Sequence, residues 1–409
     1  MILLYTILCV SAIYLSYRKY KKILNPLSLY IFIWLLNVLL YELKLIKYNS
    51  LTYKTWVILF LNIIFFSLGI FMKKRSCSLI EEKFTKDNMI RIILFLCALS
   101  GIAIFPNLFF CIKRYGINLL KMTTYIYADN VSGNGINTIP YLGSLAMLGV
   151  LFSSTYFKMY GFNKYLLLPY IMVILDILPT GSRGNLILVL VMSIIPFIFS
   201  NSNSKKKSKK QILILSSICL VFVMFYSIFT YNRRPDTPND PYVTDEMVEI
   251  NNYVPLFHKS YEYFTSPVGV LNEYLKKPRF IFGINTFSVE RNILNKFGIP
   301  VRYEHTQPVY ETPLPTNVGT WVKDFYEDFT VVGLFLCLFG IAYLLDKLYI
   351  SLEKGIVYQV LFNFLSMLVY LSWFYFFMRQ GSVTIMLFGI VGITLFLYKK
   401  CFFKNLKKE

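Results

Sequence analysis

The turn Thr180–Gly184, with the sequence TGSRG, places an arginine between two long apolar stretches of the chain. Gly181 and Gly184 permit a tight turn with exposed backbone amides. Backbone N–H groups at the start of the following helix, together with the Arg183 guanidinium, would form an anion-binding site. The simpler alternative, an arginine that reaches the lipid headgroups as an interfacial anchor, stays open.

Further arginines flank apolar stretches or lie in the one long polar segment of the chain. The guanidinium group stays charged near lipid and binds pyrophosphate oxygens in a bidentate manner, so arginine suits an anion site at a membrane surface better than lysine. Taken singly, each arginine could equally be an interfacial anchor. If several converge on one cavity, the predicted pyrophosphate-binding residues are Arg183, Arg234, Arg279 and Arg379.

The candidates for a general base also lie in the long polar segment. The chain has only two histidines, His258 and His305, and histidine titrates nearest to neutral pH. A single histidine in a loop is nonetheless more often a surface or packing residue than a catalyst. The carboxylate alternatives in the same segment are Glu304, Glu311, Asp324, Glu327 and Asp328.

The elements that must position these residues are predicted to be membrane-spanning helices. Hydrophobic residues make up 56% of the 409 residues, and charged residues only 16%. The apolar residues form continuous blocks, as helices that cross a bilayer require, at about 20 residues each. We therefore predict an all-α polytopic membrane protein with about eleven spans, at residues 1–17, 26–43, 54–72, 90–112, 139–157, 164–178, 185–200, 211–230, 329–350, 356–377 and 382–398.

The distribution of lysine and arginine predicts the orientation of these spans. No basic residue precedes the first span, whereas RKYKK (Arg18–Lys22) follows it directly. The positive-inside rule therefore places the N-terminus outside, and an odd number of spans then places the C-terminus in the cytoplasm. With this orientation, most lysines and arginines of the short loops fall on the inner side.

The net charge of +20 does not indicate a nucleic-acid partner. The long segment 231–328 holds slightly more acidic than basic residues, so the basic excess lies in the loops that orient the protein in its membrane. The cysteines form no C-x-x-C pair and no zinc-type spacing, and DTPNDPYVTDE lacks the spacing of a calcium loop. We therefore expect no metal and no cofactor.

The segment 231–328 separates a first group of spans, residues 1–230, from a last group with the tail, residues 329–409. Apolar spacing predicts helices in EMVEINNYVPLFHKSYEYF and NTFSVERNILNKFG, and prolines interrupt the remainder. We expect short helices that lie on or dip into the outer membrane surface. Because the inner loops are too short to build a site, the functional surface is predicted on the outer side.

Three stretches resemble the Wzy-type O-antigen and capsule repeat-unit polymerases. They are the TGSRG turn, FGINTF (Phe282–Phe287) and PTNVGTWVKDFYEDFTVVG (Pro315–Gly333), and the chain length, span count and position of the long loop are similar too. Members of this family often have Asp-Phe-Gly where this chain has Asp328–Thr330. The His-Asn pair at a similar position in the O-antigen ligases is replaced by Thr316–Asn317.

This resemblance implies a glycosyltransferase at the outer face of the bacterial plasma (inner) membrane. The donor would be a growing glycan on undecaprenyl pyrophosphate, and the acceptor a lipid-linked repeat unit. Arginines would stabilise the leaving pyrophosphate without a metal, and a base would take the proton of the acceptor hydroxyl. The expected catalytic residues are His305 and Asp328, with Asn317 and Tyr326 at the acceptor sugar. A flippase and a chain-length regulator are candidate protein partners.

Two other functions stay open on the sequence. A flippase or other transporter of lipid-linked oligosaccharide would also span the membrane many times, although transporters usually place ionisable residues near the midplane. Here Asp176 is predicted near an outer end of a span and Asp346 near an inner end. A ligase that transfers glycan to another acceptor would share the reaction class.

Overall fold

The computed structural model describes residues 1–73, 85–117, 125–126, 129, 139, 141–180, 182–199, 209–233, 241–255, 257–302 and 307–406. Within these ranges the chain is mainly helical, as predicted, and its one sheet is the antiparallel pair β1 (Tyr310–Glu311) and β2 (Pro315–Thr316). The chain divides into two compact units. Unit 1 holds Met1–Ser76, Asp236–Ile350 and Leu368–Gln380, and unit 2 holds Cys77–Pro235, Ser351–Met367 and Gly381–Glu409.

A helix occurs at each of the eleven predicted spans. Among the described residues, the helices long and apolar enough to cross a membrane number four: α1 (Ile2–Tyr20), α3 (Tyr53–Phe71), α4 (Lys86–Tyr115) and α13 (Trp321–Tyr349). Shorter apolar helices include α2 (Pro26–Glu42), α8 (Arg183–Ile198) and α14 (Ile356–Tyr370). These apolar helices indicate a membrane-embedded α-helical protein.

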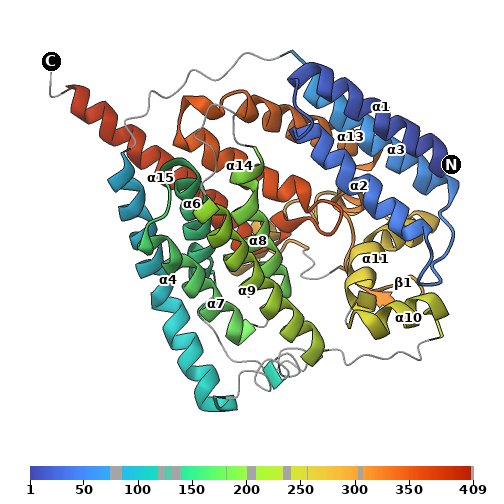
Figure 1. Ribbon diagram of the computed structural model, residues 1–409, viewed down its shortest axis with the longest axis horizontal. Helices are drawn as coiled ribbons and strands as arrows, with labels where there is room; N and C mark the ends of the chain where they lie inside the picture. The colour runs from blue at the N-terminus through green and yellow to red at the C-terminus, as the bar shows by residue number, and fades with distance from the viewer. Residues whose placement is uncertain are drawn as a thin grey trace. The chain divides into compact units, whose positions relative to one another are not determined.

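In unit 1, α3 and α13 pack closely along their length, beside α1 and α2 (Figure 1). Gly69 of α3 lies directly against the backbone carbonyl of Phe339 and the side chain of Ala342, so that a Cβ at position 69 would clash with both. Small residues at such a contact let two helix backbones approach each other, as is typical of helices within a membrane. The α3–α13 pair forms the scaffold on which the charged residues of unit 1 are placed.

The helix α13 begins earlier than the predicted span and is broken once. It starts at Trp321, so the acidic run of WVKDFYEDF is helical rather than part of the preceding loop. Thr330 has φ 62° and ψ −160°, a conformation that a β-branched residue rarely adopts, and it separates a charged first segment from the apolar remainder. The kink at Thr330 therefore gives the charged first segment of α13 a different helix axis from the apolar segment that follows it.

The described residues of the long polar segment include the helices α10 (Asp245–Tyr253), α11 (Phe257–Lys276) and α12 (Ser288–Lys296). At 20 residues, α11 is longer than the short helices predicted, because the apolar spacing of HKSYEYF continues through the VGVL stretch. Its buried face forms a core with the end of α2, residues 46–48 and α10. The buried members of this core are Tyr41, Ile46, Tyr48, Val243, Met247, Tyr261 and Val268.

One asparagine joins α11 to the start of α3. The Oδ1 atom of Asn272 accepts hydrogen bonds from the backbone N–H of Thr52 at 2.8 Å and from the hydroxyl of Thr55 at 2.7 Å. Its Nδ2 donates to the carbonyl of Ser50 at 3.3 Å. Because Asn272 is fully buried, these bonds satisfy a side chain that would otherwise be costly to bury.

Unit 2 is a bundle of α4, α6 (Leu145–Tyr160), α7 (Leu168–Thr180), α8, α9 (Lys209–Arg233) and α15 (Gly381–Leu406), with most of α14. The helix α6 packs against α4, α7, α8 and α15 and is therefore central to this unit. Its Thr155 hydroxyl accepts a hydrogen bond from the side chain of Asn363 at 2.9 Å, and both side chains are buried.

Candidate functional site

The first turns of α13 carry four charged side chains that are almost completely buried. Thr320 caps the helix by accepting a hydrogen bond from the backbone N–H of Lys323 at 3.2 Å. Lys323 and Glu327 lie one turn apart, and Lys323 Nζ is 2.5 Å from Glu327 Oε2. Asp324 Oδ1 is 3.5 Å from the same Nζ, and Asp328 is 1% exposed. Buried charges are unfavourable unless paired, so these residues need partners from other segments.

Two of the predicted arginines supply such partners. Arg279 donates from Nε to Glu327 Oε1 at 2.6 Å. Arg379, in the short helix η4 (Phe377–Arg379), has its Nη1 3.4 Å from Asp324 Oδ1. The side chain of Arg379 is 1% exposed, whereas that of Arg279 is 41% exposed. Arg279 is therefore the member of this pair that an external ligand can reach.

The loop FGINTF covers the next carboxylate of the helix. The backbone N–H groups of Asn285 and Thr286 donate to the two oxygens of Asp328 at 3.0 and 2.6 Å. The Asn285 side chain donates to Glu327 Oε2 at 3.0 Å. Positive φ angles of 48° at Phe282 and 73° at Gly283 turn the chain so that these amides point at the helix. Two of the three stretches that carry the family resemblance thus contact each other.

Polar and aromatic side chains complete the surroundings of Lys323. Gln307 donates from Nε2 to both oxygens of Asp324 at 3.0 Å. Lys323 Nζ lies 5.6 Å from the ring centroid of Tyr274 and 5.7 Å from that of Tyr310, close enough for cation–π attraction. Burial raises the pKa of the Tyr310 phenol, while the neighbouring Lys323 charge opposes that rise.

We refer to these residues as the α13 ion network. It contains three carboxylates and three cations, so its formal charges balance when all six are ionised. The amide side chains of Asn285 and Gln307 and the backbone N–H groups of Asn285 and Thr286 donate the remaining hydrogen bonds. The members are Arg279, Asn285, Gln307, Lys323, Asp324, Glu327, Asp328 and Arg379.

Aromatic side chains lie beside the exposed end of this network. Phe280 follows Arg279 in the sequence and is 54% exposed, and Phe282 is 81% exposed. The half-buried ring of Tyr326 lies between those of Phe280 and Tyr274, with centroid distances of 6.1 and 6.3 Å. An exposed cation next to flat apolar faces is a surface that suits an anionic ligand carrying sugars.

The other predicted site residues that the structure describes are not members of the α13 ion network. Asn317 is exposed and follows β2. His258 is 3% exposed within α11 and is therefore a packing residue rather than an accessible base. Arg183 belongs to unit 2 and is the first residue of α8, where Ser182 caps the helix by accepting from the backbone N–H of Asn185 at 3.4 Å.

Two predicted site residues, Arg234 and His305, lie outside the described residues. The alternative base Glu304 does so too, as does Gly181 of the TGSRG turn. The convergence of four arginines on one cavity therefore stays a prediction. Within unit 1, the structure brings together Arg279, Arg379 and the predicted carboxylates Asp324, Glu327 and Asp328.

Sequence reasoning missed Lys323, Asn285 and Gln307. A signal for the first was present, because Lys323 and Glu327 have the i, i+4 spacing of a helical ion pair. Hydropathy alone places this segment in the loop before the span, where the spacing carries no helical meaning. The roles of Asn285 and Gln307 depend on loops folding back over α13, and no local pattern in the sequence indicates this.

No metal-binding cluster of three or more His, Cys, Asp or Glu side chains occurs among the residues that the structure describes. The three carboxylates of the α13 ion network are instead occupied by cationic and amide donors.

Comparison with known proteins gives no relative: no family model, no curated protein and no solved structure matches the chain.

Proposed function

We propose that the protein is a glycosyltransferase that polymerises lipid-linked oligosaccharide repeat units at the outer face of a bacterial plasma membrane. One observation carries the proposal: Arg279 combines a 41% exposed side chain with an ion pair to the fully buried Glu327. This cation is held at the start of a long apolar helix, beside exposed aromatic rings. Such a surface fits a substrate with a lipid tail, a pyrophosphate and sugars.

The role proposed for Arg279 is to stabilise the pyrophosphate leaving group. Glu327 accepts from Nε, and the 41% exposure of the side chain lets a pyrophosphate oxygen approach the guanidinium. Glu327 is in turn held by Lys323 and Asn285 at 2.5 and 3.0 Å. The guanidinium is thus oriented before the substrate binds, which is the condition for effective electrostatic stabilisation of a transition state.

The proposed reaction forms one glycosidic bond for each pyrophosphate released. A hydroxyl of the acceptor sugar attacks the anomeric carbon of the donor glycan, and the bond from that carbon to the pyrophosphate oxygen breaks. The electron pair leaves with undecaprenyl pyrophosphate, and the base takes the hydroxyl proton. Both oxygens of Asp328 already accept from the FGINTF backbone, so we propose His305 as the base and Asp328 as a positioning residue.

The proposal is tested with purified protein in lipid nanodiscs and a defined undecaprenyl-pyrophosphate repeat unit. We expect a ladder of longer glycans, with one undecaprenyl pyrophosphate released per added repeat. His305→Ala should slow this reaction by about 10²–10⁴-fold, the range for loss of a general base. His258→Ala is the matched control, because His258 is buried in α11 and should affect stability rather than the rate of transfer.

A different result would support one of the other functions. Movement of the lipid-linked substrate across a liposome membrane, with no new glycosidic bond, would indicate a flippase. Transfer to a different lipid acceptor, with no elongation, would indicate a ligase.

The proposed orientation has an independent test. Single cysteines at positions 240 and 310 should react with a membrane-impermeant reagent applied to intact cells, and cysteines at 206 and 405 should not. Labelling at position 206 in intact cells would contradict the proposed topology, in which the N-terminus lies outside and the C-terminus in the cytoplasm.

A further inference from the structure

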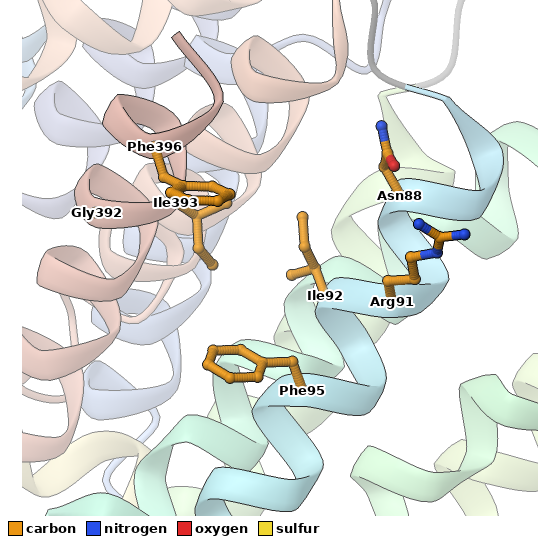
Figure 2. A pocket seen from close by; sticks show the side chains of 7 residues that line it. All are labelled: Asn88, Arg91, Ile92, Phe95, Gly392, Ile393 and Phe396. Atoms are coloured by element: carbon orange, nitrogen blue, oxygen red, sulfur yellow. The ribbon is translucent and has the colours of Figure 1, made fainter. Parts of the chain in front are cut away.

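Unit 2 contains a pocket between the first turns of α4 and the second half of α15. Its volume is about 490 Å³. In Figure 2 the side chains of Ile92 and Phe95 extend from α4 toward Ile393 and Phe396 of α15. The complete lining is Asn88, Arg91, Ile92, Phe95, Gly392, Ile393 and Phe396.

Apolar side chains at the mouth of the pocket are exposed on the surface of the protein. Phe95 is 60% exposed and Phe396 is 67% exposed, and both belong to apolar helices. An exposed phenylalanine such as Phe95, on a helix long enough to cross a membrane, is expected to face lipid, and Phe396 lies on a shorter apolar helix beside it. The surrounding phase that can fill this pocket is therefore hydrocarbon.

The polar lining residues all come from the N-terminal end of α4. Arg91 and Asn88 lie one turn apart, and Arg91 is exposed. Among the residues that the structure describes, neither side chain has a hydrogen-bond or ion-pair partner. Other charges at this end of the helix are Lys86 and Asp87, both exposed, so the local balance is positive.

We propose that this pocket binds one anionic phospholipid, with an acyl chain between Ile92, Phe95, Ile393 and Phe396 and the phosphate at Arg91 and Asn88. The guanidinium and the amide donate to the phosphate oxygens, and the apolar walls contact the chain. The net positive charge at this end favours an anionic headgroup over a zwitterionic one. The inference does not rest on the proposed glycosyl transfer, and its test uses no enzymatic readout.

A substitution at Gly392 narrows the pocket at a position where the structure has space for a Cβ. A Cβ added at Gly392 meets nothing within 4 Å, and Gly392 lines the pocket, so Gly392→Leu adds apolar volume at the pocket wall. Leucine also has a higher helix propensity than glycine. Gly340→Leu in α13 is the matched control, because a Cβ at Gly340 also meets nothing within 4 Å and lies in unit 1.

The experiment is native mass spectrometry of the protein purified with an equimolar mixture of phosphatidylglycerol and phosphatidylethanolamine. We expect one retained phosphatidylglycerol in the wild type and none in Gly392→Leu. Arg91→Gln should reduce the preference for phosphatidylglycerol by about fivefold, the equivalent of about 1 kcal/mol for one basic residue near anionic lipid. Gly340→Leu and Lys73→Gln, which removes another exposed basic residue, should bind as the wild type does.

Two results would overturn the inference. Retention of phosphatidylglycerol by Gly392→Leu would show that the lipid does not occupy this pocket. Equal retention of the two phospholipids by the wild type, unchanged in Arg91→Gln, would show that only unspecific lipid surrounds the helices.

Discussion

The two ends of α13 both bury carboxylates, and they neutralise them differently. Near the C-terminal end, Asp346 accepts from Lys19 Nζ at 2.7 Å and from the hydroxyl of Tyr20, both in the last turn of α1. Lys19 also donates to the backbone carbonyl of Ile70 at 2.6 Å. At the N-terminal end, the α13 ion network draws its partners from several distant loops.

The difference separates a structural contact from a candidate site. One carboxylate at the C-terminal end joins α1, α3 and α13, and its partners are helix ends that already pack together. The N-terminal end assembles more charge than such a contact requires and leaves Arg279 accessible. Costly buried charges that serve no simple packing purpose are a reason to look for function.

The largest effect on stability is expected for Lys323→Met at the N-terminal end. Removal of this fully buried cation leaves the α13 ion network with an excess negative charge, since Asp324 and Glu327 both face Lys323. The free energy of unfolding should fall by about 3–5 kcal/mol. Thermal unfolding of the detergent-purified protein measures this, with the exposed Lys277→Met as control. A change no larger than that of the control would show that the network does not depend on Lys323.

A smaller effect is expected for Lys19→Met at the other end. Lys19 is 28% exposed, and Asp346 keeps the hydroxyl of Tyr20 as a donor. The free energy of unfolding should fall by about 1–3 kcal/mol, the range for loss of one hydrogen-bond partner of a buried group. The same unfolding measurement applies. Glycosyl transfer at a permissive temperature should be retained, and its loss would contradict a purely structural role.

A substitution at Thr330, which lies between the two ends of α13, is expected to raise the stability of the protein rather than lower it. Its φ of 62° is strained for a β-branched residue and relaxed for glycine. Thr330→Gly should raise the free energy of unfolding by about 1 kcal/mol while leaving both charged clusters intact. Thr330→Ala serves as the control, because alanine retains the strain of a Cβ. Destabilisation by glycine would show that the threonine side chain makes a compensating contact.

The smallest expected effect concerns alkaline pH. The pKa of Tyr310 is raised by burial above its ordinary value of about 10, so the folded state holds this phenol neutral. Its contribution to stability is therefore complete below about pH 10 and is lost as the pH rises further. Tyr310→Phe should lose less stability than the wild type over this range, as measured by unfolding temperature against pH. An identical alkaline decline in both proteins would contradict the assignment.

The positions of the apolar helices could be predicted because apolar runs alone specify them, but the beginning and end of individual helices could not. The start of α13 was missed since the charged residues of WVKDFYEDF lower its hydropathy. Within the predicted span 356–377, the helix α14 ends at Tyr370. Two residues later the backbone carbonyl of Ser372 leaves the helical pattern and accepts a hydrogen bond from the backbone N–H of Trp321 at 2.9 Å. That contact is tertiary and leaves no local signal.

The residue types of the candidate site could be predicted from the sequence, but which arginine contacts which carboxylate could not. The arginines and the carboxylates could each be named from the sequence, but Arg379 meets Asp324 across 55 positions and Arg279 meets Glu327 across 48. Such pairs depend on how η4 and the loop after α11 pack against α13. Spacing along the chain could indicate only the local pair of Lys323 and Glu327.

The central claim, that Arg279 presents its charge to the pyrophosphate of the substrate, is tested most directly by the rate of glycan elongation in Arg279 variants. With purified protein and a defined lipid-linked repeat unit, Arg279→Gln should slow elongation by about 10²–10³-fold, the range for loss of one transition-state donor. Arg279→Lys should recover little of this rate, because an ammonium cannot reproduce the bidentate geometry. Lys277→Gln, two residues away and exposed, should elongate at the wild-type rate. Wild-type elongation by folded Arg279→Gln would contradict the account.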